Sequence, residues 1–116
     1  METIKVGIMP QDKIRERVLM IAKGTYQVSD SDPKIWFTSM RSLAEVLSDD
    51  NRTLLHTISE QKPESIHELA IMSGRQESNL SRTLKTLSSY DIVDLVKEGK
   101  QIRPIAKGTT FEILAT

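Results

Sequence analysis

Cysteine is absent from the 116-residue sequence, and aromatic residues make up only 4% of it. The lack of cysteine excludes disulfide bonds, thiolate metal sites and cysteine-based redox sensing, and it fits a reducing compartment. With so few aromatic side chains, the core is expected to be aliphatic. No apolar run approaches the ~18 residues of a membrane-spanning helix, and the chain does not start with a charged and then apolar leader. We therefore expect a soluble, cytoplasmic protein.

Patterns typical of catalysis or cofactor binding are also missing. The only histidines are His56 and His67, and the sequence has no glycine-rich phosphate-binding loop. Without cysteine, these residues provide no recognisable nucleophile, acid–base pair or set of metal ligands. We therefore expect no enzymatic activity, no metal site and no cofactor.

The formal net charge is zero, which argues against a nucleic-acid partner because proteins that bind nucleic acid are usually basic. The charges are unevenly distributed, however. Residues 74–107 carry seven basic and four acidic side chains, whereas residues 1–73 carry nine basic and eleven acidic ones. This modest basic excess makes residues 74–107 the half of the chain suited to face DNA.

A chain of this length is expected to form one core. Turn-forming residues at 25–33 separate an N-terminal arm from the body of the chain. We predict a strand–helix arm with its linker at residues 1–33, a body at residues 34–107 and a C-terminal strand at residues 108–116.

The arm combines a strand pattern at residues 3–9 with an amphipathic helix pattern at residues 11–23. A last strand pattern at residues 111–114 is expected to pair with the first strand, in the same chain or in a dimer mate. An apolar stripe at helical spacing is usually core or dimer interface, so we expect a homodimer. The alternative is strand addition by another protein at an exposed edge of residues 4–8. The candidate dimerisation or partner residues are Ile4, Val6, Ile8, Ile14, Val18 and Ile21.

The sequence Ile35-Trp36-Phe37 contains the only tryptophan and one of the two phenylalanines. Clustered aromatic residues usually belong to a core, so we interpret this segment as an anchor that docks the linker onto the body. A ligand-stacking pocket is the alternative. Two further helices are predicted at residues 39–47 and about 49–61, the second ending before Pro63.

Residues 65–90 have the pattern of a helix-turn-helix. Ser65 and Glu68 form a capping-box pattern that starts the first helix, and Gly74 ends it. In the second helix, Leu80, Leu84 and Leu87 follow the i, i+4, i+7 spacing of one buried stripe. The opposite face carries two cations among small hydroxyl and amide side chains, which suit hydrogen bonding to phosphates and base edges.

A β-hairpin is predicted directly after these helices, with strands at residues 92–96 and 102–105 and a glycine-containing turn between them. Pro104 in its second strand indicates an edge position. A hairpin after a recognition helix is the wing of a winged helix, and its lysines can reach phosphate or the minor groove. The candidate DNA-binding residues are Arg75, Gln76, Ser78, Asn79, Ser81, Arg82, Lys85, Thr86, Lys97, Lys100 and Arg103.

The segment from residue 34 to 107 resembles the bacterial MarR/ArsR-like winged-helix transcription regulators. The likeness lies in the Leu-Ser-Asp-Asp-Asn-Arg-Thr-Leu-Leu stretch at 47–55, in residues 78–87, and in Tyr90-Asp91-Ile92-Val93, where Asp91 replaces the usual glycine. Aspartate is the next best residue for left-handed backbone geometry. The arm strand, the tryptophan-containing linker and the Phe-Glu-Ile ending resemble a group of small prokaryotic DNA-binding proteins, some of them antitoxins.

The expected fold is therefore mainly α within the α+β class, a winged helix-turn-helix with a two-stranded wing and a strand–helix dimerisation arm. The resemblance implies a dimeric regulator, in the first place a repressor, that reads the major groove of double-stranded DNA with the helix at residues 76–89. The alternative function is an antitoxin that neutralises a toxin through its N-terminal arm and represses its own operon. Both functions can coexist.

Overall fold

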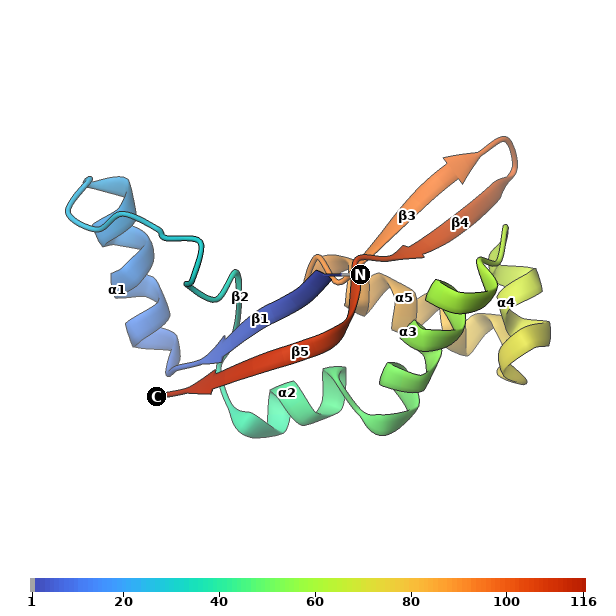
Figure 1. Cartoon of the computed structure of the whole chain (residues 1–116), viewed down its shortest axis with the longest axis horizontal. Helices are drawn as coiled ribbons and strands as arrows, with labels where there is room; N and C mark the ends of the chain where they lie inside the picture. Colours follow the sequence, from blue (N-terminus) through green and yellow to red (C-terminus); the bar gives the residue numbers. More distant parts are fainter. Residues whose placement is uncertain (1) are drawn as a thin grey trace.

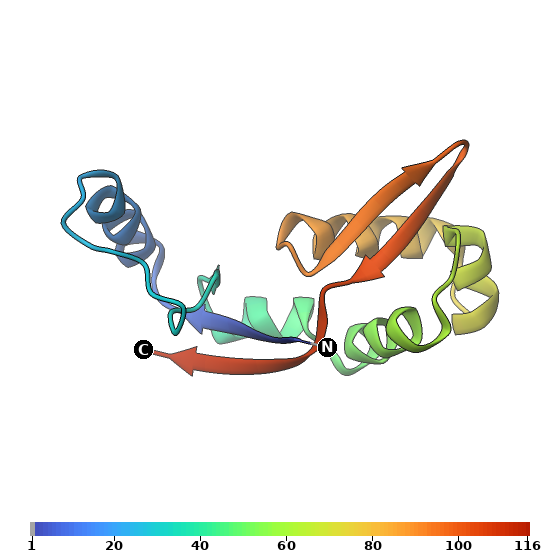
Figure 2. The same cartoon turned by 45° about the horizontal axis from the view of Figure 1, so that its top comes forward.

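The computed structural model describes residues 2–116 (Figure 1). These residues form five helices and five strands, and the strands are arranged in two separate β-sheets. The fold is thus of the α+β class. Its extents are 47 × 29 × 24 Å, and Figures 1 and 2 place the first helix and the second sheet at opposite ends of the long axis. Within residues 2–116, no helix combines the length and the apolar character needed to cross a membrane.

The first sheet has three parallel strands in the order β2-β1-β5. In its register, Val6 of the central strand lies opposite Ile35 on one side and Ile113 on the other. The predicted pairing of the first and last strands is confirmed and occurs within one chain. The expectation of an exposed strand edge at residues 4–8 is wrong, because both edges of this strand are hydrogen-bonded to neighbours. The strands are β1 (Glu2–Ile8), β2 (Ile35–Phe37) and β5 (Gly108–Ala115).

Helix α1 (Gln11–Ala22) follows β1 and contains no buried residue. A cluster around Arg17 connects it to the following loop and to the sheet. The guanidinium carbon of Arg17 lies 4.8 Å from the ring centre of Tyr26 and 5.1 Å from that of Trp36. The Tyr26 hydroxyl donates to Asp32 at 2.6 Å, and Arg17 donates to the same carboxylate at 3.4 Å. The contact with Tyr26 raises the pKa of Arg17, and the hydrogen bond from Tyr26 lowers the pKa of Asp32.

Four helices form the body, and serine side chains start three of them. Ser39, Ser48 and Ser65 each accept a hydrogen bond from the backbone N–H three residues ahead, which satisfies one of the free donors at a helix start. The predicted helices are confirmed, with ends within about two residues of the expected ones. Their bounds are α2 (Met40–Val46), α3 (Asp49–Gln61), α4 (Ile66–Ser73) and α5 (Glu77–Ser89).

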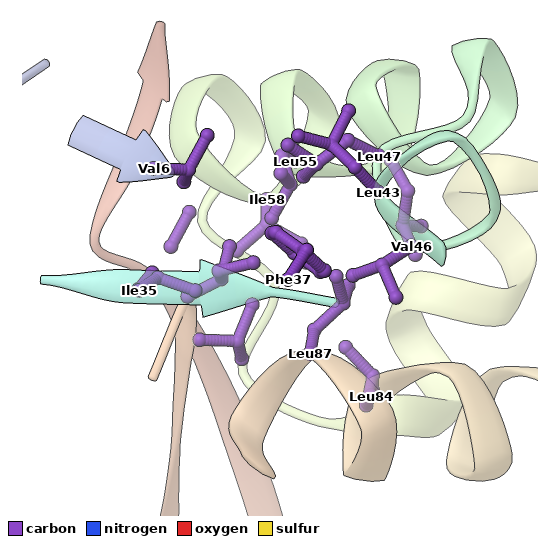
Figure 3. Close-up of a cluster of buried hydrophobic side chains, with 14 of the residues drawn as sticks. Val6, Ile35, Phe37, Leu43, Val46, Leu47, Leu55, Ile58, Leu84 and Leu87 are labelled. Carbon is purple, nitrogen blue, oxygen red and sulfur yellow. The ribbon is translucent and has the colours of Figure 1, made fainter. Parts of the chain in front are cut away.

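The core lies where the three-stranded sheet meets these helices (Figure 3). Phe37 is 1% exposed, and its ring stacks on that of Tyr90 with the centroids 4.7 Å apart, which confirms the predicted anchor. Val6 and Ile8 are buried in the same cluster as the leucines of α5. The expectation that these two side chains face a partner is therefore corrected, because the chain's own helices cover them.

The second sheet is the predicted hairpin of β3 (Val93–Glu98) and β4 (Gln101–Ala106), paired antiparallel. The strands extend further than expected, so that only Gly99 and Lys100 form the turn, with Gly99 at φ 61°. Asp91, just before the hairpin, has φ 62°, the left-handed geometry expected for the residue that replaces glycine.

Gly7 lies opposite Trp36 in the sheet, and a Cβ atom at this position would be 2.3 Å from Cζ3 of the indole ring. Gly7→Ala is expected to destabilise the fold by about 1–3 kcal/mol, because the indole has to shift to admit a methyl group. Urea denaturation of the variant measures this loss. In a Trp36→Leu background the loss should shrink, since the obstructing ring is gone; an unchanged loss would contradict the steric explanation.

Candidate nucleic-acid interface

Helices α4 and α5 are joined by a tight turn at Gly74, which has φ 73° and ends α4. In α5, Leu80, Leu84 and Leu87 are fully buried, which confirms the predicted stripe. The opposite side of the helix is therefore turned to solvent. The sequence thus fixes which side chains of α5 a large partner can reach.

The candidate residues on this helix are mostly accessible. Arg82 and Lys85 are exposed, and within residues 2–116 neither side chain has a hydrogen-bond or ion-pair partner. Thr86 donates its hydroxyl to the Arg82 carbonyl at 3.2 Å. Both cations are thus free to bind a phosphate or a base edge. The other exposed candidates here are Gln76, Ser78 and Asn79, whereas Ser81 and Arg75 are partly buried.

Arg75 belongs to a hydrogen-bond network along α5. Its Nε and Nη2 atoms donate to Oδ1 of Asn79 at 3.1 and 2.8 Å, and Nη2 also donates to the Thr83 hydroxyl at 3.1 Å. The Nη1 atom is buried without a partner. From the sequence, Arg75 and Asn79 are predicted as independent contacts, because Arg75 precedes α5 and helical spacing does not pair the two residues.

Glu77 is the one acidic residue in the first turn of α5. Its carboxylate lies 3.1 Å from Nδ1 of His67 on α4, and both side chains are exposed. This contact links the two helices. Within residues 2–116, the carboxylate bonds to neither Asn79 nor Arg82.

The hairpin presents Lys97 and Lys100 at its outer end, where both are exposed. Within residues 2–116, neither lysine has an ion-pair partner. Arg103 instead pairs with Glu98 across the hairpin at 2.8 Å, and its Nε atom is buried. Of the three predicted cations, two are thus free and one is already neutralised within the chain.

Lys107 connects the start of the hairpin to the beginning of β5. Its ammonium group binds the carboxylate of Asp91 and lies 3.3 Å from that of Asp94. The hydrogen bond with Asp91, followed by that with Asp94, raises the pKa of Lys107. This cation contributed to the local basic excess in the sequence, yet it is used to hold the junction between α5, the hairpin and the sheet.

The alternative interpretation of the aromatic segment as a ligand pocket applies to Ile35 and Trp36. A pocket of about 570 Å³ lies beside these two residues and is also lined by Tyr90, Lys34 and Asp91. Ile35 and Phe37 are both buried in the core. The anchor and the pocket therefore share Ile35, whereas Phe37 belongs to the anchor alone.

Fold and site together define a small α+β protein that displays one helix face with free cations next to a hairpin with two more. The chain belongs to the HVO_A0114 family, which it matches over residues 46–113. This segment runs from the end of α2 into β5 and includes the whole candidate interface. The function of the family is unknown. No curated protein and no solved structure matches the chain.

Proposed function

We propose that the protein is a dimeric, winged helix-turn-helix regulator, in the first place a repressor, that binds double-stranded DNA through α5 and the β3–β4 hairpin. The observation that carries the proposal is the pairing of two free cations on the exposed face of α5 with two more on the adjoining hairpin. Arg82, Lys85, Lys97 and Lys100 all lack partners within residues 2–116. Among exposed charges, unpaired cations are the ones available to replace counterions on DNA.

The chemistry of the α5 face fits a major groove, which is wide enough for one helix. Arg82 has the planar donor fork that matches O6 and N7 of guanine, and the small hydroxyls of Ser78 and Thr86 can bond phosphates or base edges. With α5 in the groove, the hairpin lies beside the helix and its lysines can contact the neighbouring backbone. The sequence resemblance to MarR/ArsR-like regulators supports the same assignment.

Two surfaces that the single chain leaves uncovered support the proposed dimer. On α1, Val18 is 58% exposed and Ile21 is 38% exposed, although both belong to the apolar stripe. Strand β5 has a free outer edge, and its Ile113 and Leu114 are 51% and 52% exposed. Figure 1 shows the end of β5 beside the start of α1, where the Thr116 N–H donates to the Ile8 carbonyl at 3.2 Å. A second copy that covers both would bring two α5 helices to one DNA site, as regulators with paired half-sites require.

The test is DNA binding by an Arg82→Ala variant. On the duplex from upstream of the protein's own gene, the variant is expected to bind about 1–3 kcal/mol more weakly, because a base contact is lost. Gel-shift titration measures the difference. Arg41→Ala is the matched control, since it removes an exposed arginine from α2, and it should bind like the wild type. Equal binding by the Arg82→Ala variant and the wild type would refute the assigned face of α5.

The uncovered α1 face also favours a second candidate function, in which another protein occupies it. In that case the chain is an antitoxin, with DNA binding used to control its own operon. Co-purification with the product of the adjacent gene tests this assignment. A stable complex that forms at the expense of the homodimer would support it, whereas a homodimer with no second protein would leave only the regulator.

A further inference from the structure

We infer that Arg75 sets the base preference of Asn79, so that Asn79 selects guanine over adenine. The inference rests on the proposed DNA-binding function and concerns the same face of α5. An asparagine with both ends of its amide free pairs with adenine, donating to N7 and accepting from the N6 amino group. Within residues 2–116, only the donating end of the Asn79 amide is free, because its oxygen accepts from Arg75.

The Asn79 carboxamide oxygen has two lone pairs, and Arg75 occupies both. The two donors are Nε at 3.1 Å and Nη2 at 2.8 Å. A guanidinium group has no acceptor, so a flipped amide would place donor against donor. The hydrogen-bonding chemistry of Arg75 therefore fixes the orientation of the Asn79 side-chain amide. Its oxygen faces Arg75, and its NH2 group is available to a partner.

The guanidinium is itself held in place before any partner arrives. Its Nη2 atom donates to the Thr83 hydroxyl at 3.1 Å, so the guanidinium of Arg75, which precedes α5, is bonded to two residues that lie one turn apart on that helix. Arg75 and Asn79 also line a groove of about 530 Å³, together with Asp50 and Thr53 of α3. The hydrogen bonds that the guanidinium donates to Asn79 and Thr83 thus all go to side chains of α5, and they orient Asn79 from the start of that helix.

The exposed NH2 group requires acceptors on the base. In the major groove guanine presents two acceptors, O6 and N7, whereas adenine presents the N7 acceptor beside the N6 donor. Against adenine, the N6 amino group would face an oxygen that is already saturated, and a desolvated donor would be left unpaired. Guanine carries no such donor at its own edge and offers two acceptors where thymine offers one, so it is the base that Asn79 prefers.

The experiment selects duplexes from a randomised 20-base-pair library with the wild type, Asn79→Ala and Arg75→Met. Asn79→Ala identifies the base-pair position that Asn79 contacts, because the base preference of the selected duplexes is lost at that position. The wild type is expected to select guanine at that position, and Arg75→Met is expected to select adenine. On the selected duplex, a guanine-to-adenine change should weaken wild-type binding roughly tenfold and should not weaken binding by Arg75→Met.

A purely structural role for Arg75 would lower affinity without changing the preferred base, so base identity is the decisive readout. Arg75→Lys serves as the second variant, because one ammonium leaves a lone pair of Asn79 free and should give an intermediate preference. Selection of adenine by the wild type, or the same base from every Arg75 variant, would overturn the inference while DNA binding stands. Failure of the wild type to enrich any duplex would overturn the proposed function as well.

Discussion

Replacing both Val18 and Ile21 with aspartate is expected to convert the proposed dimer to a monomer and to weaken the proposed binding to a palindromic duplex by about 10²–10⁴-fold. The two side chains are 58% and 38% exposed in the single chain, so the carboxylates meet water in the monomer and an apolar surface only in the dimer. Burial of an unpaired carboxylate costs free energy, so the substitutions destabilise the dimer much more than the monomer. The loss of DNA affinity follows because each monomer then binds one half-site on its own.

The measurement has two parts, the molar mass in solution by light scattering and the affinity by gel shift. Lys13→Asp is the matched control, because it alters the net charge by the same two units. Lys13 lies on another face of α1, where its side chain is 62% exposed and pairs with Glu16 at 3.6 Å. The control should stay dimeric and bind DNA nearly as well as the wild type.

The stability of the folded chain separates this result from simple unfolding. Helix α1 contains no buried residue, so the two aspartates do not touch the core, and the circular dichroism spectrum of the variant should match that of the control. A variant that remains dimeric would show that α1 is not the interface. A wild type that is itself monomeric in solution would reject the homodimer and favour a different protein on α1.

The helices of the body were predictable because their signals are local. A serine three residues before a free N–H marks a helix start, and leucines at 80, 84 and 87 define one buried stripe whatever lies against them. The pairing of the first and last strands was predicted for another reason. Each strand pattern had no partner nearby in the sequence, so the two patterns could satisfy each other's backbone groups.

The parts that the sequence did not reveal depend on contacts between distant residues. Alternation at Ile4, Val6 and Ile8 indicates one buried face, but it does not say that strands will pair on both sides. The charge count treated every cation as available, whereas Lys107 and Arg103 are bound by carboxylates that only the fold brings near. The Arg75 network is similar, because Arg75 lies before α5 and the path of the chain between α4 and α5 decides whether its guanidinium reaches Asn79.

The largest effect on stability is expected for Phe37→Ala, at about 3–5 kcal/mol, the usual cost of deleting a fully buried phenylalanine. Phe37 is 1% exposed and stacks on Tyr90 just after α5, so its ring joins the three-stranded sheet to the helix proposed to read DNA. Because small proteins are stable by only about 5–15 kcal/mol, this one change should remove a large part of the total. Urea denaturation followed by circular dichroism measures it.

Phe111→Ala is the matched control, since it deletes the only other phenylalanine, which lies partly buried in β5 at the margin of the core. Its loss should be clearly smaller, because part of its ring already contacts water. Tyr90→Leu, combined with Phe37→Ala in a double-mutant cycle, isolates the stacking contact, for which about 0.5–1.5 kcal/mol is expected. Equal losses for the two phenylalanines would mean that the sheet and α5 are not joined mainly through Phe37. In that case, contacts at the margin of the core, such as those of Phe111, would stabilise the sheet as much as Phe37 does. The position of α5 would then not depend on the stacking of Phe37 on Tyr90.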